Sequence, residues 1–308
     1  MPSLKLTVLL SSLLFVGAFA SPLTAQNESR PTTLPATTVA IPKNPEKVKT
    51  ALARFQERNA KKRSMSADMD MNMSMMGMEI KGSGTILTNA DGRSRTELNM
   101  NVPMFQGTIK TTMLNDGKNV WQITDMPEGF PGPKGPQIFK GTKEESDAMT
   151  KKQGGAGMPG TGSDDMVGQI DNLKKEYDFD TMEDSVTIDN KQYWAISGER
   201  RKDVPAGPPN PMTGMIKRVR ALFTADTDLF SGVEMLDGGG KKIMVMYMKN
   251  FNLEPKFDEK AFAYTPPEGA KVLSFADAMR GAGMGDEDEE DEDEEDAPAP
   301  PASKPAGK

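Results

Sequence analysis

Residues 221–275 read ALFTADTDLFSGVEMLDGGGKKIMVMYMKNFNLEPKFDEKAFAYTPPEGAKVLSF. Within them, residues 233–236 and 243–248 are two apolar runs on either side of the Gly-rich segment 237–240. Two such runs around a glycine turn are typical of an antiparallel β-hairpin. The segment FDEKAF that follows indicates a turn, and the chain then reaches the ending YTPPEGAKV.

More strands are expected upstream of this hairpin. From Met65 onward the apolar residues alternate with polar ones, and turn signals at residues 89–92 and 115–117 divide the strands into a meander. The apolar positions change parity near residues 75–77, which predicts a bulge or a sharp bend. Further strands are expected at residues 185–188 and 192–199.

Two helices are expected to pack on the sheet. The first begins at the cap Asn44, and the second follows a cap within residues 163–165. Each carries apolar residues at helical spacing, which is typical of one buried helix face. A short third helix is expected at residues 212–219. Residues 126–162 read as a long Pro/Gly-rich loop with a short helix near 143–151.

The order of these elements resembles that of the LolA-like family, the periplasmic carriers of outer-membrane lipoproteins and their lipid-binding relatives. The motifs DGKNVW (residues 116–121) and PPEGAKV (residues 266–272) carry the resemblance, which covers most of residues 45–275. It implies an α+β fold, a curved antiparallel β-sheet (an incomplete barrel) with helices covering its concave face. The long Pro/Gly loops and the acidic tail depart from the family pattern.

The resemblance also implies a function and a set of partners. The cavity under the helices would take up the acyl chains of a lipid or a lipoprotein, with membrane-bound donor or acceptor proteins as further partners and no cofactor. In carriers of this family an arginine on an early strand helps govern cargo release. Arg95 stands where that arginine is expected, and Arg93 is an equal candidate.

Methionine is abundant, with 24 residues in the chain. Its flexible, polarisable side chain suits surfaces that must fit varied apolar partners, although it also fills ordinary cores. The candidates for the cavity lining are Met69, Met71, Met73, Met75, Leu98, Met100, Trp121, Trp194, Met244 and Met246. The two helices are expected to act as lids through Leu52, Phe55, Met166 and Ile170.

The two ends of the chain differ from its middle. Residues 1–25 read as a signal peptide, with a basic residue, an apolar run and cleavage after Ala20 or Ala25, which predicts a periplasmic protein. Residues 26–43 form a flexible linker, and 44–275 the binding domain. Residues 276–308 are an acidic and Pro/Ala-rich tail for which disorder is expected.

The composition argues against most enzyme classes. The chain has no cysteine and no histidine, which removes thiol catalysis, the commonest general base and the commonest metal ligand. The net charge of −7 comes from the tail, where residues 286–296 are all acidic, so nucleic acid is not an expected partner. We therefore expect a monomeric binding protein that is not an enzyme.

Two alternatives remain at the level of sequence. The string MDMNMSMMGM, residues 69–78, offers thioether ligands for Cu(I) or Ag(I), with Met71 and Met73 as candidates. Successive sulfurs on one strand face are about 7 Å apart, too far for one ion unless a loop folds over them. The second alternative is an envelope sensor that uses the same fold to bind a protein partner.

Overall fold

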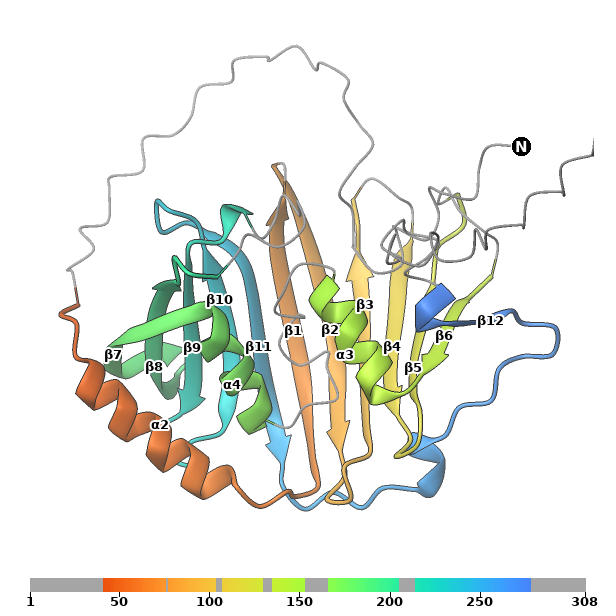
Figure 1. Ribbon diagram of the computed structural model, residues 1–308, viewed down its shortest axis with the longest axis horizontal. Coiled ribbons are helices and arrows are strands. Elements are labelled where there is room, and N and C mark those ends of the chain that lie inside the picture. Colours follow the sequence, from red (N-terminus) through yellow and green to blue (C-terminus); the bar gives the residue numbers. More distant parts are fainter. Residues whose placement is uncertain are drawn as a thin grey trace, which may run out of the picture.

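The computed structural model describes residues 41–75, 77–103, 107–129, 135–152, 166–204 and 214–277. In this part of the chain, twelve strands form one sheet in the order β12-β6-β5-β4-β3-β2-β1-β11-β10-β9-β8-β7 (Figure 1). Neighbouring strands are antiparallel except β12 and β6, which run parallel. The expected α+β fold with a curved, open sheet is confirmed.

The first half of the sheet is a meander. Its strands are β1 (Met65–Met75), β2 (Met78–Thr88), β3 (Ser94–Asn101), β4 (Thr108–Asn115), β5 (Val120–Asp125) and β6 (Gln137–Gly141). Met75 pairs with Met78 across the β1–β2 turn, so the segment expected to be one strand with a bulge or a sharp bend is instead a hairpin of two strands. Gly92 and Gly117 follow in the predicted turns with φ of 94° and 89°, a region that favours glycine.

The helices and the second half of the sheet complete the fold. The helices are α2 (Pro45–Asn59), α3 (Lys143–Lys152), α4 (Met166–Glu176) and the short η2 (Glu259–Phe262). The strands are β7 (Tyr177–Ile188), β8 (Lys191–Arg200), β9 (Arg218–Thr224), β10 (Phe230–Leu236), β11 (Lys242–Asn252) and β12 (Val272–Ser274). The predicted hairpin is β10 and β11, with the turn at residues 237–240.

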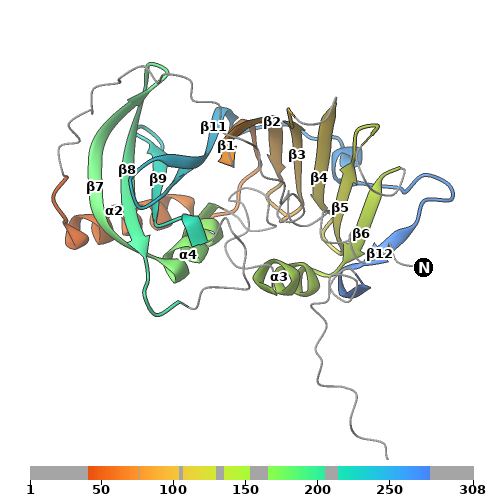
Figure 2. The same cartoon turned by 90° about the horizontal axis from the view of Figure 1, so that it is seen from above.

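Three helices lie on the inner side of the curved sheet. Figure 2 shows α2 and α4 over one half of the arc and α3 over the other. We call this side the inner face, and it carries Met69, Met71 and Met73 of β1 together with the residues paired to them across the sheet. The outer face carries the alternate residues of each strand, such as Asp70 and Asn72.

Aromatic rings join α2 to the inner face. Phe55 of α2 meets Phe223 edge-on with ring centroids 5.0 Å apart, and Trp194 stacks on Phe223 at 3.9 Å. The helix begins where expected, since the Asn44 side chain accepts the Lys47 backbone N–H at 3.0 Å. Sequence periodicity and capping therefore place the apolar face of α2 directly on the main core.

A second core lies on the outer face. Residues 253–271, which we call the strap, run from the end of β11 across β3 to β6 before β12 joins the edge of the sheet. Phe262 of the strap packs with Leu114 and Trp121, and Tyr264 meets Trp121 edge-on at 5.4 Å. The irregular ending predicted from sequence thus covers the outer side of the meander.

Two sequence expectations need correction. The third helix at residues 212–219 is wrong, because only Gly214 and Met215 are helical among its described residues and β9 begins at Arg218. The long loop expected at 126–162 contains β6, which pairs with β5 and β12. The short helix expected within that loop is confirmed as α3.

Some expectations concern segments outside the described residues. They are the signal peptide at 1–25, most of the linker at 26–43, the helix cap at 163–165 and the tail beyond residue 277. These expectations stay predictions. In the part of the chain that the structure describes, no helix has the length and apolar character needed to cross a membrane.

Candidate functional site

The centre of the inner face is built from paired methionines. Three alternate positions of β1 lie directly opposite methionines of β11, and we call these pairs the methionine rungs. They are Met69–Met248, Met71–Met246 and Met73–Met244. All six side chains are at most 4% exposed, and Met235 of β10 pairs with Met244 to extend the set. The alternation seen in sequence therefore produces one continuous apolar strip across three strands.

Most of the other predicted lining residues share this core. Leu98 and Met100 of β3 are 3% and 1% exposed and belong to the same cluster as the methionine rungs, as does Trp194 of β8. Trp121 does not, because it lies on the outer face under the strap. The side chain of Met75 lies outside the described residues. The structure thus separates the two tryptophans that sequence grouped together.

The two predicted helices contribute to the same apolar cluster as this strip. Leu52 and Phe55 of α2 and Ile170 of α4 are buried in the same cluster as the methionine rungs, and Met166 packs against it while half-buried. A hydrogen bond of 3.3 Å from Gln56 to Asp171 also joins the two helices. Movement of either helix would expose apolar side chains of the inner face.

Asp228 fixes α2 to the turn between β9 and β10. Its carboxylate is 1% exposed and accepts hydrogen bonds from Arg54 at 2.9 Å and from Trp194 Nε1 at 2.7 Å. Arg58 Nη1 lies 2.7 Å from the other oxygen, and Asn59 Nδ2 donates to the Asp228 carbonyl at 3.1 Å. Sequence reasoning missed this residue, since an aspartate in a turn between strands is usually exposed.

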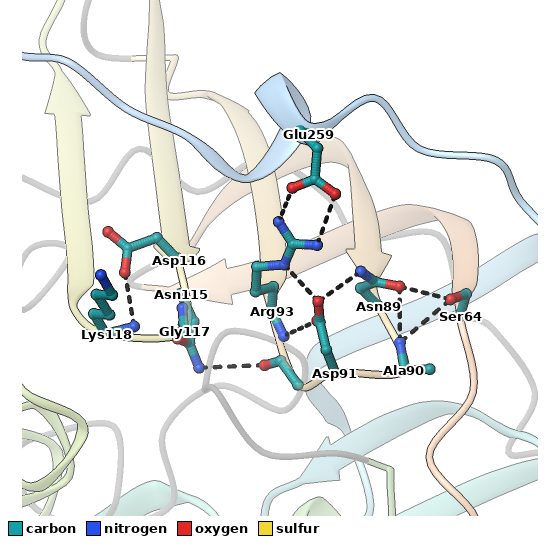
Figure 3. Close-up of polar contacts among 11 residues, drawn as sticks. Ser64, Asn89, Ala90, Asp91, Arg93, Asn115, Asp116, Gly117, Lys118 and Glu259 are labelled. Atoms are coloured by element: carbon teal, nitrogen blue, oxygen red, sulfur yellow. Dashed lines mark hydrogen bonds and ion pairs between the residues drawn. The ribbon is translucent and has the colours of Figure 1, made fainter.

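The two arginines predicted to govern release face the strap. Figure 3 shows Arg93 between Asp91 and Glu259, and its guanidinium also lies over the Phe262 ring at 5.2 Å. Arg95 bonds Glu97 at 2.7 Å and the strap carbonyl of Ala261 at 3.3 Å. Both therefore reach the outer face, on the opposite side of the sheet from the methionine rungs.

Local hydrogen bonds order the turns beside Arg93. The Arg93 backbone N–H, followed by the Arg93 side chain, holds the pKa of the Asp91 carboxyl below its usual value. Asn89 bonds Asp91 and Ser64, which joins this turn to the start of β1 (Figure 3). These hydrogen bonds order the turns, and Arg93 then binds Glu259 of the strap from a fixed position.

The inner face carries buried polar residues on β3 and β5, next to the apolar Val120 and Phe139. Thr96, Gln122 and Thr124 are buried there, at 6%, 9% and 3% exposure. Thr96 lies two residues before Leu98 on β3, and Gln122 and Thr124 pair with Met113 and Thr111 of β4. All three side chains are therefore on the same face as Leu98 and Met100. Sequence reasoning gave these residues no role, although their period-two placement was visible.

The site offers apolar and uncharged polar contacts. Within the described ranges, no group of three or more His, Cys, Asp or Glu side chains is arranged to hold a metal ion. The methionine rungs of β1 and β11, and Met235 of β10 beside them, carry thioethers, which bind apolar groups or soft ions. The arrangement is therefore suited to an apolar ligand that has a small polar part.

Comparisons with known proteins address the fold. No protein-family model and no curated protein matches the chain. Among solved structures, it is similar to an uncharacterized conserved protein from Thermus thermophilus, with 10% identity, a TM-score of 0.43 and coverage of 74% of this chain and 99% of that one. MucB matches with 11% identity and a TM-score of 0.42, over 71% of this chain and 63% of MucB.

A LolA superfamily protein, NE2245 from Nitrosomonas europaea, is also similar. It has 11% identity and a TM-score of 0.29, with coverage of 70% of this chain and 97% of that one.

Proposed function

We propose that this protein binds the acyl chains of a lipid or a lipoprotein on its inner face and shields them from water in the periplasm. The observation that carries the proposal is the strip of methionine rungs, which is buried on the inner face of an open sheet in the same apolar cluster as residues of α2 and α4. Membrane-bound donor or acceptor proteins would deliver and receive the cargo.

Burial of the acyl chain of the ligand would supply the binding free energy. Each methylene group that leaves water contributes about 0.8 kcal/mol. The methionine side chains are flexible, so they can repack around chains of different length when α2 or α4 moves aside.

The direct test is native mass spectrometry of the mature protein purified from its own envelope, followed by extraction with organic solvent. We expect a bound mass that extracts as lipid, and uptake of a fluorescent fatty acid by the emptied protein. A protein that carries no lipid and takes up no fatty acid would contradict the proposal.

Replacing Met71 with glutamine should weaken this binding. A glutamine amide that is buried against an acyl chain has no hydrogen-bond partner in place of water. We therefore expect the fluorescent fatty acid to bind about tenfold more weakly or worse. Asn72→Gln changes the exposed neighbour on the outer face and should bind as the wild type does. Met71→Leu keeps volume and polarity and should also bind normally. Equal affinities for all four proteins would place the ligand elsewhere.

The methionine rungs also support a second candidate, binding of Cu(I) or Ag(I). Met71 lies opposite Met246, and Met73 opposite Met244, so partners from β11 supply thioethers that one strand alone cannot. Directly opposed Cβ atoms are about 4.5–5.5 Å apart, within reach of a shared ion. Titration with Ag(I) should show one tight ion in the wild type and none in Met71→Leu/Met73→Leu. Equal weak binding by both proteins would exclude this candidate.

A further inference from the structure

The inner face changes chemistry along a single row of paired residues. The row runs from Met248 and Met69 through Gly84 to Leu98, and then to Thr111 and Thr124. It is apolar over the central strands and carries hydroxyl groups over β4 and β5. A ligand lying along this row would meet thioethers at one end and hydroxyls at the other.

Thr124 is the unusual member of this row. Its side chain is 3% exposed, yet its Oγ1 has no hydrogen-bond partner. The backbone of β5 is paired on both sides, with β4 through Thr111 and with β6 through Gln137, so the Thr124 side chain is held on the inner face. A buried hydroxyl without a partner is costly to the folded state, and such groups usually have a partner that is missing from the structure.

The two residues paired with Thr124, which are Thr111 and Gln137, are polar and uncharged, and Ile109, Met113 and Phe139 beside them on the same face are apolar. Thr96 and Gln122 lie on the same face and are buried, and Gln137 is paired directly with Thr124. The inner-face positions of β3 to β6 are Ser94, Thr96, Leu98, Met100, Ile109, Thr111, Met113, Asn115, Val120, Gln122, Thr124, Gln137, Phe139 and Gly141. None of these side chains is ionised, so these strands offer hydrogen bonds without a charge.

We propose that Thr124 marks the headgroup end of the binding face and selects acyl lipids whose chain ends in an uncharged ester. The Thr124 hydroxyl donates to the ester carbonyl, while the acyl chain lies over the methionine rungs. This inference rests on the proposed function and adds to it the class of lipid and the residue that recognises it.

The inner-face side chains of these strands are uncharged, and α3 adds the carboxylate of Glu145 beside Gly141. An ionised carboxylate or phosphate would lose its water on entering this end of the face, and the inner-face positions of β3 to β6 supply no cation to replace that water. An ester carbonyl has a much smaller desolvation cost and needs a single donor, which the Thr124 hydroxyl provides.

The test compares two ligands with the same chain, 1-palmitoylglycerol and palmitate, by displacement of a fluorescent fatty acid at neutral pH. We expect the glycerol ester to bind about tenfold more tightly or better. Thr124→Val should reduce ester affinity by about fivefold and leave palmitate affinity unchanged, as expected for the loss of one neutral hydrogen bond. Thr85→Val, on the exposed outer face of β2, should change neither affinity.

The ligand-free protein gives an independent readout. Because Thr124→Val removes a buried hydroxyl that has no partner, its thermal midpoint should equal or exceed that of the wild type. A lowered midpoint together with an unchanged ester-to-acid ratio would show that the hydroxyl serves the fold, and would overturn the inference.

The outcomes also separate this inference from the proposed function. If neither ligand binds, the proposed function fails and the inference fails with it. If both ligands bind equally and Thr124→Val alters neither affinity, only the inference fails.

Either a free glycerolipid or the lipid anchor of a lipoprotein can supply the ester. A synthetic diacylglyceryl-cysteine peptide distinguishes these sources, since tighter binding of the peptide than of dipalmitoylglycerol identifies the anchor, and the reverse identifies the free lipid.

Discussion

Replacing Asp228 with alanine is expected to lower the free energy of unfolding by about 3 kcal/mol and to loosen α2 from the sheet. The carboxylate is buried at 1% exposure and holds Arg54, Arg58 and the Trp194 indole together. Its removal leaves the buried indole N–H without an acceptor. Arg54 and Arg58 are about half exposed, so water compensates them in part, which keeps the loss below that of a fully buried pair.

Two further substitutions test the cause of this loss of stability. Asp228→Asn keeps one carbonyl acceptor and removes the charge, so its loss should be smaller than that of alanine. Asp226→Ala changes an exposed aspartate in the same turn and serves as the matched control. Urea unfolding gives the free energies, and amide hydrogen exchange across residues 45–59 reports the attachment of α2. Unchanged exchange in Asp228→Ala would show that the aromatic contacts alone hold the helix.

The same variants test whether α2 controls access to the inner face. If it does, Asp228→Ala should take up and release a fluorescent fatty acid faster than the wild type, while Asp226→Ala does not. The converse experiment uses the absence of native cysteine. Arg54→Cys/Thr227→Cys, joined by a short bis-maleimide linker, should slow exchange relative to the unlinked double variant. If neither Asp228→Ala nor the crosslink alters the rate of fatty-acid exchange, α2 does not control access to the inner face.

Local signals were enough to predict much of this fold. The glycine turn at residues 237–240 and the apolar runs beside it defined β10 and β11, and capping at Asn44 defined α2. These features depend on interactions between residues close in sequence, which backbone preference and period reveal. β6 and β12 were missed because each is short and lies beside Pro- and Gly-rich segments, so only their pairing across the chain identifies them.

The site was predicted in part for a similar reason. Period-two spacing identified Met69, Met71 and Met73, but it could not reveal that three methionines of β11 lie directly opposite them. Trp121 and Trp194 have similar local sequence patterns, yet the strap covers one and α2 covers the other. Asp228 gains its role only from Arg54 and Trp194, which are distant in sequence, and such partners cannot be inferred from local patterns.

A buried charge cluster on the outer face carries the other large expected effect. Glu234 of β10 is 1% exposed and is contacted by Arg220 at 3.1 Å, by Lys242 at 2.6 Å and by the Tyr247 hydroxyl. Arg220 also binds Glu183 through two hydrogen bonds of 2.7 and 2.8 Å. Burial alone would raise the pKa of Glu234, but the hydrogen bonds and charges of Lys242, Tyr247 and Arg220 more than offset it and lower the pKa.

Replacing Glu234 with alanine should therefore cost about 3–5 kcal/mol of unfolding free energy, because Arg220 is left largely buried with less compensation. Lys242 is half exposed and can turn to water, which limits the loss. The paired replacement Glu234→Leu/Arg220→Leu removes both charges and should recover much of the stability. If the double variant is as unstable as Glu234→Ala, packing and not charge accounts for the loss.

The same cluster predicts how stability depends on pH. A carboxyl whose pKa is lower in the folded state than its ordinary value of 4.5 stabilises the fold fully above that value, and the contribution is lost as pH falls through the folded-state pKa. The difference in unfolding free energy between the wild type and Glu234→Gln should therefore be constant above pH 4.5 and shrink below it. Glu199→Gln, at an exposed position of β8, is the control substitution, and its unfolding free energy at neutral pH should match that of the wild type. A difference for Glu234→Gln that persists unchanged in acid would mean that shape, and not the charge of Glu234, stabilises the outer face. Because this cluster lies on the opposite side of the sheet from the methionine rungs, folded Glu234→Gln should still bind fatty acid at neutral pH as the wild type does.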